Sequence, residues 1–292
     1  MINIIKTLLW VTVSGLAVFP FSIAGADSLA YLKYTDDFWQ VHIRDTETDV
    51  ERKITNTKYD KTRISWVGEN RIFVNGVQGQ MAIIDLTTAR ETSLPFISSH
   101  VNDAVISKDG RFILYSSISD TSDLNRLYIY DRSSGDITEL PKRDGLQFDP
   151  AWSRQSEYFF FVAGDDVSPY SLWKSSLDGS DQRVVVRNKH HNLDINESRN
   201  GVLAYSSNRS GNYDIWLENN GSSRQLTEHD GYDGKPVWAN DNKTIYFESA
   251  RNGVVNIWSI SVSNDGEDGW GKPVQVTHSE KGARLPVAYA GD

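Results

Sequence analysis

Histidine and acidic residues are the first candidates for chemistry in this sequence. Five of the six His lie in polar stretches rich in turn residues, and Asp or Glu often accompanies them: His100, His190, His191, His229 and His278. Neutral imidazole and carboxylate groups are common metal ligands. However, no two His show the spacing that places a pair of ligands on one element. We therefore expect no cofactor and no catalytic metal, and we keep Ca²⁺ open as an ion that the acidic loops would hold.

Nucleophilic catalysis has little support in the sequence. There is no Cys, which excludes thiolate nucleophiles, thiolate metal sites and disulfides. No Gly-x-Ser-x-Gly elbow occurs, and the many Ser residues fall in turns, where hydroxyl groups cap the backbone. An enzyme that acts on carbohydrate through paired carboxylates remains an alternative.

The elements that must position these residues follow from an internal repeat. The stretch Val101–Ser117 realigns with Phe148–Gly164 and Gly234–Ala250, and more weakly with Lys61–Gly76 and Leu193–Ser207. Each copy is followed by a polar loop, an apolar or aromatic strand, a turn and a short closing strand. Four short strands per unit of roughly 44 residues indicate the blades of a β-propeller.

The two ends of the chain complement each other. The segment after residue 26 begins at the second strand of a unit, and the last residues, 283–292, resemble a first strand. Joined together, they complete a sixth blade. The sequence therefore predicts an all-β, six-bladed propeller of four antiparallel strands per blade over residues 27–292, closed by the C-terminal strand in the first blade.

The repeats resemble those of TolB-like β-propellers. The positions that carry the resemblance are Arg209, Gly211, Ile215, Trp216, Leu226, Thr227, Pro236, Trp238, Asn242, Ile245 and Phe247. The resemblance covers the propeller portion and not the N-terminal α/β domain of such proteins, which we do not expect here. It implies a protein-binding surface in the periplasm.

The N-terminus predicts export. Residues 1–26 combine Lys6, an apolar run and the small residues Ala24–Ala26, which is typical of a secretory signal peptide. Cleavage would leave a periplasmic protein without a membrane-inserted segment. The formal net charge of −9 would repel phosphate backbones, which makes nucleic acid an unlikely partner class.

One side of the propeller should carry the function. The loops after the second strands and the links between blades lie on the same side, and they contain those five His. Recurrent Trp residues are interpreted as packing between blades. We expect a non-enzymatic module that binds a periplasmic or membrane-associated protein or peptide. The candidate binding residues are Trp39, Asp149, Arg209, His229, Tyr232, Arg251, His278 and Arg284. A sensing subunit of a membrane regulator is a further alternative.

Overall fold

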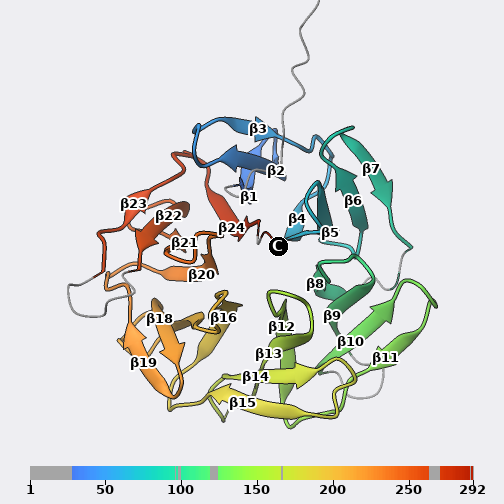
Figure 1. Cartoon of the computed structure of the whole chain (residues 1–292), viewed down its shortest axis with the longest axis vertical. Coiled ribbons are helices and arrows are strands. Elements are labelled where there is room, and N and C mark those ends of the chain that lie inside the picture. Colours follow the sequence, from blue (N-terminus) through green and yellow to red (C-terminus); the bar gives the residue numbers. More distant parts are fainter. Residues whose placement is uncertain are drawn as a thin grey trace, which may run out of the picture.

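The computed structural model is a ring of six β-sheets around a central channel (Figure 1). It describes residues 28–95, 97, 100–118, 124–165, 167–262, 270–289 and 291. The predicted signal peptide, 1–26, lies outside the described residues. Twenty-four strands form six four-stranded antiparallel sheets, and no helix occurs among the described residues. The predicted fold class is confirmed.

Every blade has the same strand order, and its innermost strand lines the channel. From the channel outwards, the strands are β24 (Ala283–Ala288), β1 (Ser28–Thr35), β2 (Phe38–Asp45) and β3 (Glu51–Lys53) in blade 1; β4 (Lys61–Trp66), β5 (Arg71–Gly76), β6 (Met81–Asp85) and β7 (Arg90–Ser93) in blade 2; β8 (Val101–Ile106), β9 (Phe112–Ile118), β10 (Asn125–Asp131) and β11 (Ile137–Glu139) in blade 3; β12 (Leu146–Trp152), β13 (Tyr158–Gly164), β14 (Ser171–Ser176) and β15 (Gln182–Val186) in blade 4; β16 (Asn192–Glu197), β17 (Leu203–Ser207), β18 (Asp214–Asn219) and β19 (Ser222–Gln225) in blade 5; and β20 (Asp233–Trp238), β21 (Thr244–Ser249), β22 (Asn256–Ser261) and β23 (Val274–Gln275) in blade 6.

The two ends of the chain close the ring in blade 1. Strand β24, drawn in red, pairs with the blue strand β1 (Figure 1), and Leu32 lies opposite Arg284 in this antiparallel register. Backbone hydrogen bonds thus fasten the last strand to the first. The ring is closed, and no edge of β1 is left open to pair with another chain.

The hydrophobic core lies between neighbouring blades. The predicted packing role of the recurrent Trp residues is visible in two inter-blade hydrogen bonds. The indole nitrogen of Trp66 in blade 2 donates to the carbonyl of Val287 in blade 1 (3.0 Å), and that of Trp152 in blade 4 donates to the carbonyl of Val105 in blade 3 (3.2 Å).

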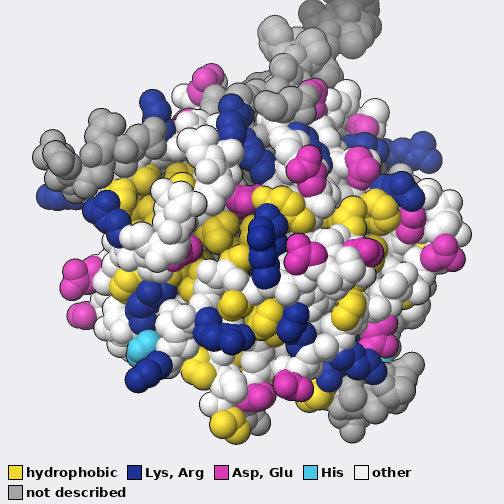
Figure 2. Space-filling model, turned by 60° about the horizontal axis from the view of Figure 1, so that its bottom comes forward, with side chains coloured by type: hydrophobic (Ala, Val, Ile, Leu, Met, Phe, Trp, Pro, Cys, Tyr) yellow, Lys and Arg dark blue, Asp and Glu magenta, His cyan; other side chains and the backbone are white. Residues whose placement is uncertain are grey.

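On the outside, Figure 2 shows one side of the molecule, where basic and acidic side chains are interspersed and hydrophobic ones lie between them. No extended basic stripe is visible on that side.

A β-bulge interrupts each of the six innermost strands. In four of them one repeat position, three residues before Trp152 and its equivalents in the other blades, has a positive φ of 49 to 59°. The four residues are Asp149, Asp194, Lys235 and Leu285. Bulges bend a strand and re-aim its side chains. Here they bring the same repeat position of these blades to the wall of the channel.

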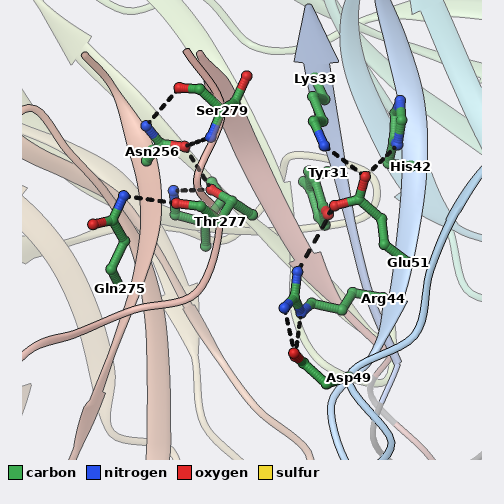
Figure 3. Close-up of polar contacts among 11 residues, drawn as sticks. Tyr31, Lys33, His42, Arg44, Asp49, Glu51, Asn256, Gln275, Thr277 and Ser279 are labelled. Atoms are coloured by element: carbon green, nitrogen blue, oxygen red, sulfur yellow. Dashed lines mark hydrogen bonds and ion pairs between the residues drawn. The ribbon is translucent and has the colours of Figure 1, made fainter. Parts of the chain in front are cut away.

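In blades 5 and 6 the recurrent Thr lies just beyond the closing strand, which ends at Gln225 or Gln275. Thr277 Oγ1 accepts the amide of Ile257 (2.8 Å) and donates to the Asn256 side chain (2.9 Å), whose oxygen also accepts the amide of Ser279 (Figure 3). Thr227 caps Ile215 in the same way. This polar cap fixes the start of the link to the next blade.

Blade 1 contains a second polar cluster, centred on Glu51 of β3 (Figure 3). Its carboxylate accepts from Lys33 (2.7 Å), from His42 Nδ1 (3.0 Å) and from the hydroxyl of Tyr31. The hydrogen bond from His42, together with those from Lys33 and Tyr31, lowers the pKa of Glu51 below its ordinary value, although burial acts in the opposite direction. The cluster ties β1, β2 and β3 together beside the ring closure.

Candidate functional site

The loop face is the side of the ring that carries the loops between second and third strands and the links between blades. Hydrogen bonds join these segments. The amide of Asp233 donates to the carbonyl of Tyr213 (2.9 Å), and the side chain of Asn212 donates to the carbonyl of His229 (2.6 Å). These bonds fasten the loop of blade 5 to the link that leads into blade 6.

A ring of repeat-equivalent side chains surrounds the channel just below the loop face. The ring consists of Leu285, Arg63, Asp103, Asp149, Asp194 and Lys235, in the order of blades 1 to 6. Five of the six, all except Asp103, line a cavity of about 230 Å³. The walls of this cavity combine these charged side chains with apolar ones, and Trp66, Trp152 and Trp238 lie at the later end of the innermost strands.

Two cations and two carboxylates of this ring join across the channel mouth. Arg63 donates to Asp149 at 2.9 Å, and Lys235 contacts the same carboxylate at 3.4 Å. Lys235 also pairs with Asp194, whose amide donates to Asp149 at 2.9 Å. Each of the two cations is separated from Asp149 by 86 residues of chain. This ionic lattice connects blades 2, 4, 5 and 6 without passing through a sheet.

The electrostatics of the lattice favour the charged forms. Burial by itself would raise the pKa of the Asp149 carboxyl, but Lys235 and Arg63 outweigh burial and hold that pKa below its ordinary value. Burial likewise opposes the charge on Lys235, and Asp149 and Asp194 raise its pKa. Nearby Glu248 differs, because burial raises its pKa.

Aromatic side chains form part of the rim of the channel mouth in blades 4 to 6. Tyr213 meets Tyr232 edge-on, with ring centroids 6.4 Å apart, and Tyr170 packs on His191 at 4.5 Å. A Cβ atom at Gly234 would overlap the Tyr232 hydroxyl, so this ring lies flat against the start of β20 only because residue 234 is glycine. Burial, with the nearby carboxylates, raises the pKa of Tyr232.

The predicted arginines of blades 5 and 6 are engaged within the protein. Arg209 stacks on Trp216 (4.1 Å from guanidinium carbon to ring centroid) and bonds to the hydroxyl of Tyr205. Arg251 stacks on Trp258 (4.8 Å) and forms an ion pair of 2.8 Å with Asp233, whose side chain is fully buried. Both side chains thus hold a loop of their own blade in place.

The other predicted residues are spread around the mouth. Arg284 lies 3.9 Å above the ring of Trp39 in blade 1, and His278 is exposed in the link that leads there. His229 Nδ1 accepts the amide of Gly231 (2.8 Å). These residues share the loop face but do not converge on one another, and their binding role stays a prediction.

The sequence-based selection omitted the cations of the lattice. Arg63 and Lys235 occupy the repeat position of Asp149 in their own blades, so a comparison of that position across all six repeats would have identified them. It also omitted Arg143 and Arg187, which lie in the links on either side of blade 4. The signal for these two is a pair of basic links, residues 142–143 and 187–191.

Neither a metal-binding cluster nor a membrane-spanning helix is found in the described part of the chain. Within the described ranges, no three His, Asp or Glu side chains are grouped closely enough to hold a metal ion. In the same part of the chain, no helix has the length and apolar character needed to cross a membrane.

Comparison with known proteins identifies the fold. No family model matches the sequence, and no curated protein matches it. Among solved structures, a TolB of Acinetobacter baumannii superimposes with a TM-score of 0.73 at 15% identity, covering 91% of this chain and 67% of that one. A protein described as TolB from Agrobacterium tumefaciens gives 0.69 at 17% identity, covering 86% of this chain and 88% of the other. An oligogalacturonate lyase in complex with manganese gives 0.59 at 12% identity, covering 82% and 87%. This six-bladed propeller is therefore similar in fold to TolB proteins and also to a lyase.

Proposed function

We propose that the protein is an exported, periplasmic module that binds a protein or peptide through its loop face. The observation that supports this most is the ionic lattice over the channel. An enzyme would use the carboxylates of Asp149 and Asp194 there. Asp149 already forms ion pairs with Arg63 and Lys235, and Asp194 forms one with Lys235. A mouth of this kind, flanked by aromatic side chains, offers a contact surface for a partner.

The likeness to TolB supports the same proposal at the level of fold, and the N-terminal sequence supports export. The lyase has the same fold, so fold does not decide between binding and catalysis. The lattice supports the binding role: lyase chemistry needs an acid and a base that are free to exchange protons with a substrate, whereas Asp149 and Asp194 are engaged by Arg63 and Lys235.

Site-directed photo-cross-linking in the periplasm tests the proposal. A photoreactive residue at exposed His278 or Val167 reports from the loop face, and one at exposed Glu69 or Asn200 reports from the strand-one to strand-two turns on the opposite side. We expect a discrete cross-linked protein from the first pair and none from the second. Equal cross-linking from both sides, or none from the loop face, would contradict the proposal.

A further inference from the structure

Blade 4 differs from blades 5 and 6 in how its third-strand Trp is covered. Trp216 and Trp258 are each stacked by one arginine from the loop of the same blade, Arg209 or Arg251. The equivalent position in blade 4 is Asp165, whose carboxylate caps the amides of Val167 and Ser168. The ring of Trp173 is therefore free to receive side chains from elsewhere.

Two arginines from different links cover Trp173 instead. Arg143, from the link between blades 3 and 4, lies 3.9 Å from the ring centroid, measured from its guanidinium carbon. Arg187, from the link between blades 4 and 5, lies 5.3 Å from it. The aromatic ring thus holds two like charges close together in blade 4.

Neither guanidinium has an acidic partner among the described residues. Arg143 donates to the side-chain oxygen of Gln182 (2.7 Å) and to the carbonyl of the same residue (3.3 Å), which are both neutral acceptors. Arg187 is exposed, and its contact is with the Trp173 ring. Burial and the charge of Arg187 lower the pKa of Arg143, and no carboxylate offsets them.

The surroundings contain more donors than acceptors. The side-chain nitrogen of Gln182 is buried with no hydrogen-bond partner, and so is Nε of Arg126. Arg126 donates to the carbonyl of Gly145, two residues along the link from Arg143. Buried polar groups are nearly always paired in folded proteins, so these two buried donors are exceptions among the described residues.

We infer that Arg143 and Arg187, held on Trp173, form a binding site for carboxylate groups of an acidic protein segment. A guanidinium presents a rigid planar fork of donors that fits a carboxylate with two hydrogen bonds. Two such groups on one ring can engage adjacent acidic side chains of an extended segment. The inference rests on the proposed function, because it names the chemistry of the partner, and it places the anchor in blade 4.

A direct titration tests the site with a defined probe. A hexaglutamate peptide is titrated calorimetrically into the full chain at about 0.15 M salt, where screening over roughly 8 Å suppresses repulsion by the acidic remainder of the protein. We expect binding that weakens about tenfold or more in the double variant Arg143→Gln with Arg187→Gln. The double Lys variant should lie in between, since an ammonium keeps the charge without the planar fork.

Matched controls separate this site from bulk charge. Arg224, on the outer strand of blade 5, also stacks on a Trp: its guanidinium carbon lies 4.7 Å from the ring centroid of Trp270. The Arg224→Gln variant should bind the peptide like the wild type. Hexalysine should not bind. Equal affinity of the wild type and the double Gln variant, or equal loss in Arg224→Gln, overturns the inference. Inorganic phosphate that binds the same arginines more tightly than the peptide overturns the assignment to an acidic segment.

The titration is independent of the cross-linking experiment. If the peptide binds at Arg143 and Arg187 but no cross-linked protein is recovered from the loop face, the carboxylate site holds and the proposed function fails. If a protein is recovered whose cross-link is unchanged in the double Gln variant and the peptide does not bind, the proposed function holds and the site is wrong.

Discussion

Arg251 in blade 6 and Arg143 in blade 4 stack on Trp residues at the same position of the repeat, yet their surroundings differ. Arg251 reaches the buried carboxylate of Asp233 at the start of β20. The equivalent residue at the start of β12 is Gln147, which is neutral and accepts the backbone amide of Arg143. The comparison teaches that two arginines stacked at the same repeat position differ in their partners: an acid on the innermost strand neutralises Arg251, and the equivalent residue beside Arg143 carries no charge.

The largest effect on the unfolding free energy is expected for Asp149, whose carboxylate pairs with two cations. Asp149→Asn leaves Arg63 and Lys235 without their shared carboxylate, and breaking a buried ion pair typically costs about 3–5 kcal/mol. The folded-state pKa of Asp149 is lowered from 3.8, so its ionised form stabilises the fold above about pH 3.8, and this contribution is lost as the pH falls through the lower folded-state pKa.

Urea denaturation between pH 7 and pH 2.5 measures this contribution. The difference in unfolding free energy between wild type and Asp149→Asn should be greatest near neutral pH and should shrink below about pH 3.8. A difference that does not change over this range would show that the ionised carboxylate does not stabilise the channel mouth.

Arg251→Met tests the structural member of the compared pair. The substitution leaves the fully buried Asp233 carboxylate without its cation. We expect a loss of about 3 kcal/mol in unfolding free energy. Adding Asp233→Asn to the same variant removes the stranded charge and should recover much of that loss. If Arg251→Met unfolds at the wild-type urea concentration, then this arginine is not what neutralises Asp233.

Gln182→Glu converts the blade 4 site toward the blade 6 arrangement. The new carboxylate would accept from Arg143 where the Gln182 oxygen does now, at 2.7 Å, and the buried amide nitrogen without a partner would be replaced by an oxygen. We expect a gain of about 0.5–1 kcal/mol in unfolding free energy and a roughly fivefold loss of hexaglutamate affinity. Unchanged affinity by calorimetry would indicate that the peptide binds elsewhere.

The smallest effect is expected for Arg143→Met. No acidic group loses a partner, and the stacking contact with Trp173 is worth about 0.5–1 kcal/mol, part of which the methionine side chain restores by packing on the ring. Thermal and urea unfolding should therefore differ little from the wild type. A loss as large as that of Arg251→Met would place Arg143 among the structural arginines and end the contrast between the two blades.

Much of the architecture could be predicted, since each blade repeats the same local pattern. The anchor positions Trp66, Trp152 and Trp238 and the complementary chain ends together gave six blades and the ring closure. The role of the recurrent Thr needed the structure: its side chain accepts an amide of the neighbouring strand just after its own strand has ended.

The loop face follows from strand alternation in the sequence, and the binding role of the residues selected there stays a prediction. Of the two acids that line the channel in the ionic lattice, Asp149 was selected from the sequence and Asp194 was not. Arg63 and Lys235 could have been found only by comparing the repeat position of Asp149 across all six blades, where these two blades carry cations. Whether an arginine such as Arg251 is already paired cannot be read from its loop, since its partner Asp233 lies 18 residues away.

By itself, the sequence determined the strands, their grouping into blades and the closure of the ring, because alternation, turn residues and repeat length are local properties that hydrophobic burial enforces in every copy. The tertiary structure decided which charges meet. Arg63 and Asp149 lie 86 residues apart, and Arg143 and Arg187 converge on Trp173 from two different links. Electrostatic pairing depends on distance and burial in space, and in a ring these are set by the assembly of all six blades.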